Sequence, residues 1–264
     1  MKINWSEQTV VITGAYGSLG LELCKSLSAR GADLILTGRN LDKLQQLKKI
    51  LPQTTKVVSG NIASRKFKDD LVACLEGIKT AGHMLINNAG ISDVRFLEQL
   101  TDDSIKNMLV VNLLTPMLLS KKLMPWLKKA QSAKIINIGS TFGAIGYPGF
   151  SGYCATKFGL RGFTQALDRE LADTNISVQY LAPRAIATNM NSDKVNLLNK
   201  KLNNDVDTLE QILPQIIKAI EKGRTEIFFG WPAKLFVKLN GLFPSIVANA
   251  INKEHKIIKQ IIEK

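Results

Sequence analysis

Ser140, Tyr153 and Lys157 are the side chains whose types and spacing best suit chemistry on a carbonyl group. Tyr153 and Lys157 are four residues apart in an expected helix, which places them on one helix face. A free tyrosine titrates near about pH 10, so a nearby cation must lower its pKa before it can cycle at neutral pH, and Lys157 is the candidate. Ser140 ends an expected strand, and its hydroxyl could hold a substrate carbonyl beside the phenol. The spacing alone is also typical of a surface pair on any helix, so other motifs must support it.

A glycine-rich turn follows the first expected strand. It reads Thr13-Gly14-Ala15-Tyr16-Gly17-Ser18-Leu19-Gly20, and the amphipathic segment LELCKSLSAR comes after it. Glycines there allow a tight turn and a close approach of backbone to a pyrophosphate, which the helix N-terminus would hold. The turn therefore predicts a dinucleotide site, with a purely structural corner as the alternative.

The end of the second expected strand bears on the choice of cofactor. It reads Leu36-Thr37-Gly38-Arg39-Asn40, without the carboxylate that commonly binds the ribose 2′-hydroxyl of NAD. The planar guanidinium of Arg39 could instead pair with a 2′-phosphate, which favours NADP(H) over NAD(H). The alternative is that Arg39 merely opens the next helix on a solvated surface.

Short apolar runs rich in β-branched residues alternate with longer helical patterns along the chain. The expected strands are residues 9–13, 33–37, 56–59, 84–87, 134–138, 177–181 and 226–229. Right-handed crossovers wind such strands into a parallel sheet with helices on both faces and ligands at the carboxyl ends of the strands. We therefore predict an α/β fold, a Rossmann-type doubly wound sheet of about seven strands. It forms a single domain, residues 1–230, with a C-terminal helical tail, residues 231–264.

Together these motifs resemble the short-chain dehydrogenase/reductase family from about residue 9 to residue 229. The resemblance rests on the glycine turn, Asn87-Asn88-Ala89-Gly90, Asn112, Ser140, Tyr153 with Lys157, and Pro183-Arg184-Ala185-Ile186-Ala187-Thr188. It implies that Tyr153 is the general acid/base and that Ser140 orients the carbonyl. Lys157 would tune the phenol and bind ribose, and Asn112 would anchor a proton-relay water.

The resemblance also implies the cofactor contacts. Asn88, Ala89 and Gly90 would line the adenosine side, and Ile186 and Thr188 would meet the nicotinamide carboxamide. The complete expected cofactor set is Gly14, Tyr16, Gly17, Ser18, Leu19, Gly20, Arg39, Asn61, Ile62, Asn88, Ala89, Gly90, Tyr153, Lys157, Pro183, Ile186 and Thr188.

Three positions depart from the family pattern. Ser18 stands where the middle glycine of the turn is usual. Gly60-Asn61-Ile62 replaces an acidic residue after the third strand, and the carbonyl oxygen of Asn61 could accept the adenine hydrogen bond instead. Arg184 follows Pro183 where glycine is common, so it contacts the pyrophosphate, contacts an anionic substrate group, or points to solvent.

Composition narrows the class of protein. The chain has 264 residues, 45% hydrophobic and 22% charged, as a folded globular domain does. Three scattered cysteines favour a reducing compartment, and with only two histidines we expect no metal site. The sequence shows neither a signal-peptide pattern nor the apolar run of about 18 residues that a membrane span requires. We therefore predict a cytoplasmic location.

The formal net charge of +13 suits nucleic acid, an anionic membrane, or an anionic cofactor and substrate. We find no nucleic-acid-binding motif, and so expect no specific nucleic-acid partner. In the tail, apolar residues recur at helical spacing among lysines: Leu235, Phe236, Leu239, Leu242, Phe243, Ile246, Val247, Ala250 and Ile251. This stripe packs on the protein's own core or on a second subunit, or gives the tail a peripheral contact with an anionic membrane.

The expected function is an NADP(H)-dependent interconversion of a carbonyl and an alcohol, with a small-molecule substrate and a homodimeric or homotetrameric chain. A lipophilic or acyl-type ketone or aldehyde is the favoured substrate, although the polar segment 189–213, the expected substrate lid, does not specify one. The alternative is a non-catalytic nucleotide-binding scaffold of the same fold. The intact set of Ser140, Tyr153 and Lys157 argues against that alternative.

Overall fold

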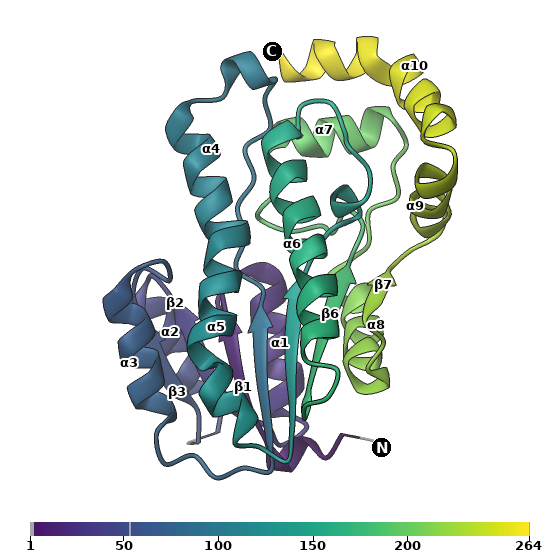
Figure 1. Ribbon diagram of the computed structural model, residues 1–264. Coiled ribbons are helices and arrows are strands. Elements are labelled where there is room, and N and C mark those ends of the chain that lie inside the picture. The colour runs from purple at the N-terminus through teal and green to yellow at the C-terminus, as the bar shows by residue number, and fades with distance from the viewer. Residues whose placement is uncertain (1–2, 53, 264) are drawn as a thin grey trace.

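The computed structural model describes residues 3–52 and 54–263, and its centre is a seven-stranded parallel sheet (Figure 1). The order of the strands across the sheet is β3-β2-β1-β4-β5-β6-β7. Their bounds are β1 Gln8–Thr13, β2 Asp33–Gly38, β3 Lys56–Ser59, β4 Gly82–Asn87, β5 Ser132–Ile138, β6 Ile176–Ala182 and β7 Glu226–Phe228. The chain reverses its winding direction between β1 and β4, where a doubly wound sheet places its ligand. The predicted Rossmann-type fold is confirmed.

Helices cover both faces of the sheet, and each face has its own apolar core. The helices are α1 Ser18–Ser28, α2 Leu41–Lys49, α3 Arg65–Leu75, α4 Asp102–Leu109, α5 Thr115–Lys128, α6 Ser151–Glu170, α7 Asp193–Lys201, α8 Leu209–Lys222, α9 Ala233–Leu242 and α10 Pro244–Ile262. Side chains of α1, α2 and α8 form the core on one face, and side chains of α3, α5 and α6 form the core on the other. Because Val10 joins the first core and its neighbour Val11 the second, β1 is apolar on both faces, as a central parallel strand must be.

Four strands begin earlier in the chain than the sequence pattern predicted, β1 and β6 by one residue and β4 and β5 by two. Backbone pairing, rather than hydrophobicity, sets these starts. Gly82 of β4 pairs with Gln8 on one side and with Ser132 of β5 on the other, which extends these strands by polar or small residues. The correction leaves the carboxyl ends of the strands, where the candidate site lies, within a residue of their predicted positions.

The segment expected to be a substrate lid contains α7 and the start of α8, and local hydrogen bonds set where both helices begin. The Ser192 hydroxyl accepts from the Val195 backbone N–H, and Thr208 and Gln211 form a reciprocal capping box. Between the helices, Asp207 pairs with the Ala185 to Ala187 backbone after β6. The lid is therefore tied to the strand end that carries Pro183.

The C-terminal tail forms two helices, α9 and α10, which run along the carboxyl end of the sheet (Figure 1). The last turns of α10 pack on α7 and on the loop after β4 through Ile258, Ile261 and Ile262. Lys194 also donates a hydrogen bond to the Ile262 carbonyl oxygen, 2.8 Å. In the described ranges, no helix has the length and apolar character to cross a membrane.

Candidate active site

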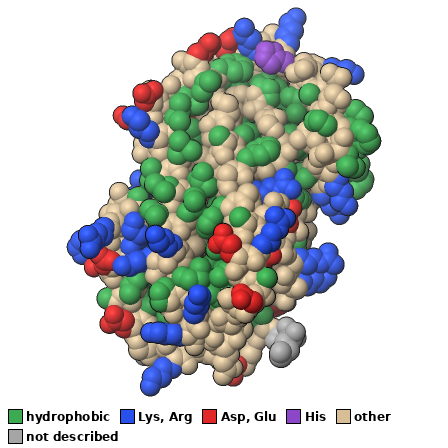
Figure 2. Space-filling view, viewed as in Figure 1, with side chains coloured by type: hydrophobic (Ala, Val, Ile, Leu, Met, Phe, Trp, Pro, Cys, Tyr) green, Lys and Arg blue, Asp and Glu red, His purple; other side chains and the backbone are tan. Residues whose placement is uncertain are grey.

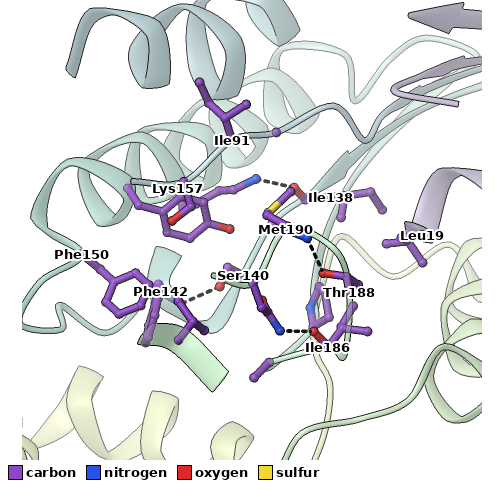
Figure 3. Close-up of a pocket in the computed structure, with 18 of the residues that line it drawn as sticks. Leu19, Ile91, Ile138, Ser140, Phe142, Phe150, Lys157, Ile186, Thr188 and Met190 are labelled. Atoms are coloured by element: carbon purple, nitrogen blue, oxygen red, sulfur yellow. Dashed lines mark hydrogen bonds between the residues drawn. The ribbon is translucent and has the colours of Figure 1, made fainter. Parts of the chain in front are cut away.

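One large cavity of about 1230 Å³ lies at the carboxyl ends of the strands. It runs from the glycine turn, past Ser140 and Lys157, to the lid and to the inner sides of α9 and α10 (Figure 3). Ser140 also lines it, and so does every residue of the expected cofactor set: Gly14, Tyr16, Gly17, Ser18, Leu19, Gly20, Arg39, Asn61, Ile62, Asn88, Ala89, Gly90, Tyr153, Lys157, Pro183, Ile186 and Thr188. Residues predicted from separate motifs thus share one cavity wall, whereas Asn112 lies behind it.

The glycine turn needs glycine at two of its positions. Gly14 has a φ of +66°, and a Cβ there would lie 3.0 Å from the Ala89 Cα. A Cβ on Gly20 would collide with the Gly14 carbonyl oxygen. Gly17 is the N-cap of α1 with an ordinary φ of −70°, and Ser18 is the first helical residue. The turn therefore presents the α1 N-terminus to the cavity without a glycine at position 18.

Asn88 holds the turn in place from the end of β4. Its side-chain amide donates to the carbonyl oxygens of Thr13, at 3.0 Å, and Gly14, at 3.3 Å. In return, the Thr13 hydroxyl accepts from the backbone N–H groups of Asn88 and Ala89, both at 2.9 Å. The Asn88 side chain thus supports the phosphate turn from below, in addition to lining the cavity.

Two cations border the end of the cavity beside Tyr16. Arg39 and Lys43 both line it, and the Lys43 ammonium lies 5.7 Å from the centroid of the Tyr16 ring. Along the described cavity wall the acidic residues are Asp205 and Glu254, which belong to the lid and to α10. The sequence analysis did not predict that Lys43 lines the cofactor cavity. Its position four residues after Arg39, in the first turn of the following helix, could have indicated it.

Asn61 has a local partner for the oxygen expected to meet adenine. Its side-chain carbonyl oxygen accepts a hydrogen bond from the Ala63 backbone N–H at 3.0 Å, in the turn that leads to α3. A carbonyl oxygen has two lone pairs, so one remains for a ligand. Ile62 is buried beneath the turn and contributes an apolar patch of the wall.

Ser140, in the turn that follows β5, and Lys157, on α6, face the cavity (Figure 3). The Lys157 ammonium donates to the Ile138 carbonyl oxygen at 2.9 Å and lies 5.6 Å from the centroid of the Tyr153 ring. The Ser140 hydroxyl oxygen accepts from the Phe142 backbone N–H at 3.1 Å. That bond uses one lone pair of Ser140, and the same hydroxyl also acts on the phenol of Tyr153, whose pKa it lowers.

Burial dominates the electrostatics of this group. It raises the pKa of Tyr153 to about 12, against a smaller lowering by the Ser140 hydroxyl. It also lowers the pKa of Lys157 to about 8. The expectation that Lys157 brings the Tyr153 pKa below its usual value does not hold in this structure. The ammonium hydrogen-bonds to Ile138 and not to the phenol, so desolvation of the phenol outweighs the attraction of the cation.

Lys157 gives a testable pH dependence of stability. A pKa of about 8 in the folded chain, against about 10.4 unfolded, means that burying the ammonium destabilises the fold. Below about pH 8 this penalty is complete. Between about pH 8 and 10.4 the unfolded chain binds more protons, so the penalty disappears as pH rises. We expect Lys157→Met to be more stable than the wild type by about 2 kcal/mol at pH 7, after about 1 kcal/mol for the lost hydrogen bond.

Thermal unfolding of wild type and Lys157→Met between pH 6.5 and 10 measures this effect. The difference in Tm should be largest below pH 8 and should shrink towards pH 10. Lys129→Met, which removes an exposed lysine, is the matched control and should show no such trend. A difference for Lys157→Met that is independent of pH would contradict the assigned burial penalty.

Asn112 is buried in a π-helical turn, Val110–Leu114, between α4 and α5. Its side-chain amide donates to the Ile91 carbonyl oxygen at 2.8 Å and to the Thr156 hydroxyl at 3.1 Å, and its oxygen accepts from the Ile91 N–H at 2.8 Å. Both amide hydrogens are therefore used to hold the loop after β4 against α6. The anchoring of a relay water by Asn112 stays a prediction, and the amide hydrogens are not free for it.

Comparison with known proteins places the chain in a family. The family model for short chain dehydrogenases matches residues 8–197, a range that includes the glycine turn, Ser140, Tyr153 and Lys157. This chain belongs to the short-chain dehydrogenase/reductase family. It is accordingly an oxidoreductase of an NAD(P)-dependent class.

Individual relatives agree with this family. Nodulation protein G of Rhizobium meliloti (strain 1021) is 34% identical over 191 residues, which cover 72% of this chain and 78% of that protein. A 3-oxoacyl-(acyl-carrier-protein) reductase of Rickettsia conorii (strain ATCC VR-613 / Malish 7) is 30% identical over 194 residues, which cover 74% of this chain and 78% of the reductase.

Solved structures of short-chain dehydrogenases share the fold. One from Streptomyces avermitilis has a TM-score of 0.79 at 22% identity, covering 96% of this chain and 98% of its own. One from Burkholderia cenocepacia J2315, in complex with NADP, has a TM-score of 0.78 at 20% identity, covering 92% and 96%. At this identity the likeness concerns the fold alone.

Arg184 is the departure from the family pattern with the largest structural consequence. Its guanidinium makes a bidentate pair with Asp207, 2.7 and 3.0 Å, and donates to Asp205 and to the Trp231 carbonyl oxygen, 2.7 and 2.8 Å. It thus joins the loop after β6 to the lid and to the start of the tail. Of the three predicted partners, solvent is replaced by these protein groups, while Arg184 also lines the cavity, so a contact with the pyrophosphate or a substrate anion stays a prediction. The sequence could not show this because both carboxylates lie more than 20 residues away.

Replacing Arg184 with glycine, the residue usual in the family, should destabilise this chain. The carboxylate of Asp207 is 9% exposed and would lose its bidentate partner. Breaking a buried pair on one side costs about 3–5 kcal/mol, so we expect Tm to fall by roughly 5–15 °C. The double variant Arg184→Gly/Asp207→Asn removes the stranded charge and should recover part of the loss. Calorimetry that finds the single variant as stable as the wild type would contradict this account.

In the described part of the chain, histidines, cysteines and carboxylates form no group of three or more that could hold a metal ion.

Proposed function

We propose that this chain is an NADP(H)-dependent reductase of lipophilic ketones or aldehydes. The observation that carries the proposal is a single cavity that joins three features. These are a phosphate-binding turn beside two cations, the Ser140, Tyr153 and Lys157 group, and an apolar region under the lid and tail. Cofactor, proton donor and substrate could therefore occupy one continuous space.

The residues at the turn fit NADP(H). Gly14 and Gly20 keep the space that a Cβ would fill, and α1 directs its free backbone N–H groups to the cavity. Arg39 and Lys43 border the same end, and they suit the two negative charges of a 2′-phosphate. The structure from Burkholderia cenocepacia, which shares the fold, was solved in complex with NADP. Once bound, the cofactor would supply hydride to the carbonyl carbon.

Tyr153 is assigned as the proton donor to the carbonyl oxygen. With a pKa raised to about 12, its phenol carries its proton at neutral pH. A phenol in this state can donate at once, whereas the reverse reaction would first need a phenolate. The assignment rests on the place of this protonated phenol in the cavity wall, beside Ser140 and Lys157.

Ser140 is assigned to orient and polarise the substrate carbonyl. The Phe142 N–H fixes its hydroxyl oxygen, so the remaining proton can point to the substrate. Lys157 is assigned to the ribose of the cofactor, because its ammonium has one fixed partner, Ile138, and two hydrogens left to donate.

The substrate region combines apolar side chains with polar ones of the lid and α10, among them Asn199, Asn203, Asn204, Asp205 and Glu254. Phe142, Ile145 and Phe150 line it from the catalytic side, and side chains of α7, α9 and α10 line it from the opposite side: Val195, Leu198, Phe236, Val247, Ala250 and Ile251. Burial of each additional methylene on such a surface contributes about 0.8 kcal/mol. The relative from Rickettsia conorii is by name a reductase of 3-oxoacyl groups, which supports an acyl-type substrate.

The test is a titration with NADPH and with NADH at fixed salt, followed by turnover of methyl ketones and aldehydes of four to ten carbons. We expect tighter binding of NADPH and a rise in kcat/KM of at least about tenfold along the series, which two buried methylenes would already supply. Binding of neither cofactor would overturn the enzyme assignment in favour of a scaffold. Turnover without dependence on chain length would overturn the lipophilic substrate alone.

A further inference from the structure

The bend between α9 and α10 exposes an unusual set of apolar side chains. We call residues 231–250 the elbow. Within the elbow, the buried side chains are Val237 and Val247. Four large apolar side chains are more than half exposed: Trp231 62%, Leu242 73%, Phe243 54% and Ile246 56%. Phe243 and Pro244 lie at the bend itself, so Leu242, Phe243 and Ile246 project from its outer tip.

The elbow also carries lysines and contains no acidic residue to neutralise them. Lys234 and Lys238 lie on α9 between the exposed apolar residues, and the Lys234 ammonium lies 5.8 Å from the centroid of the Trp231 ring. The sequence contains no aspartate or glutamate from residue 227 to residue 253. In Figure 2, green side chains gather along the upper right edge, where Figure 1 places α9 and α10, with blue side chains next to them.

We propose that the elbow docks on an anionic lipid surface. Apolar side chains at a tip, a tryptophan at its border and lysines beside them are the combination that enters the interface of a charged bilayer. A two-fold contact between copies of the chain fits the charges less well. It would place the elbow lysines of both copies against each other, without carboxylates in the elbow to neutralise them.

Docking through the elbow would place the substrate region of the cavity next to the lipid surface. Phe236 of the elbow is 40% exposed and also lines the cavity, as do Val247 and Ala250. The outer side of the elbow would meet the lipid while its inner side borders the substrate region. A lipophilic carbonyl compound could pass between them with little exposure to water. This route rests on the proposed function, whereas docking itself does not.

The test is co-sedimentation of the full chain, without cofactor or substrate, with vesicles. One set is pure phosphatidylcholine, and the other contains about 30% phosphatidylglycerol. We expect binding to the anionic vesicles that is weakened by salt, and weak or no binding to the neutral ones. Leu242→Ser/Phe243→Ser should lower the partition coefficient at least about 100-fold, from the loss of two apolar insertions. Lys234→Gln/Lys238→Gln should lower it by about 30-fold.

Matched controls separate docking from general stickiness. Ile50→Ser removes an apolar side chain that is 65% exposed at the far end of α2, and Lys128→Gln/Lys129→Gln removes two exposed lysines at the end of α5. Both controls should bind like the wild type. None of the substituted residues lines the cavity, so every variant should reduce a short, water-soluble ketone at the wild-type rate, if the chain is a reductase at all.

Each outcome decides the proposal. Loss of vesicle binding in the elbow variants but not in the controls supports it. Absence of wild-type binding to anionic vesicles overturns it, as does equal binding by all variants. Gel filtration in which the elbow variants dissociate a dimer, with vesicle binding unchanged, assigns the elbow to a second copy instead. Because sedimentation needs no turnover, failure of docking and failure of the proposed reductase activity are distinguishable.

Discussion

Tyr153→Phe is expected to lower kcat by about 10²–10⁴-fold while the affinity for NADPH changes little. The substitution removes one hydroxyl and keeps the ring, which packs edge-on against Phe142 with 6.5 Å between centroids. The proton for the substrate oxygen would then have to come from water in a buried site. Single-turnover kinetics, together with a fluorescence titration of NADPH, measures both quantities.

Tyr147→Phe is the matched control. Tyr147 lines the same cavity, but its hydroxyl donates to Glu254 at 3.3 Å, away from Ser140. We expect this variant to keep kcat within about tenfold of the wild type, since it removes a positioning hydrogen bond and no proton donor. Near-normal turnover by Tyr153→Phe would remove Tyr153 from the mechanism.

Arg39→Asp is expected to raise the Kd for NADPH by at least about 100-fold and the Kd for NADH by no more than a few fold. A charge-assisted pair with the 2′-phosphate contributes about 1.5–3 kcal/mol, and the new carboxylate adds repulsion. The same carboxylate could accept a hydrogen bond from the 2′-hydroxyl of NADH. Lys43→Gln should give a smaller loss in the same direction, because its ammonium is a point charge without the bidentate geometry.

The control for Arg39 is Arg30→Asp, which makes the same change of charge after the end of α1 and outside the cavity. It should leave both dissociation constants within about twofold. Equal losses of NADPH and NADH affinity in Arg39→Asp would show that Arg39 acts on the fold or on the pyrophosphate. The NADP(H) preference would then need another explanation.

The fold was predictable because a parallel sheet leaves a strong pattern. Adjacent residues such as Val10 and Val11 are buried on opposite faces of β1, so the strand appears as a continuous apolar run. The starts of β4 and β5 were not predictable in the same way. They depend on pairing of Gly82 with its neighbours, which is a contact between distant parts of the chain.

The residues of the candidate site also differ in how far the sequence could predict them. Residues fixed by local geometry, such as Gly14 and Gly20 in the turn, were recognisable from their spacing. Properties set by burial or by distant partners were not. The raised pKa of Tyr153 follows from desolvation, and the role of Arg184 follows from Asp207, far along the chain.

The most direct test of the central claim is the fate of the hydride at C4 of the nicotinamide. The protein would be incubated with NADPH deuterated on either face of C4 and with the ketone and aldehyde series, and the products analysed by mass spectrometry. The account predicts an alcohol with deuterium on the carbinol carbon from one of the two labelled cofactors, formed by the wild type and at least about 100-fold more slowly by Tyr153→Phe. Label that stays on the nicotinamide with every substrate, although NADPH is bound, would contradict the claim that this chain reduces carbonyl groups.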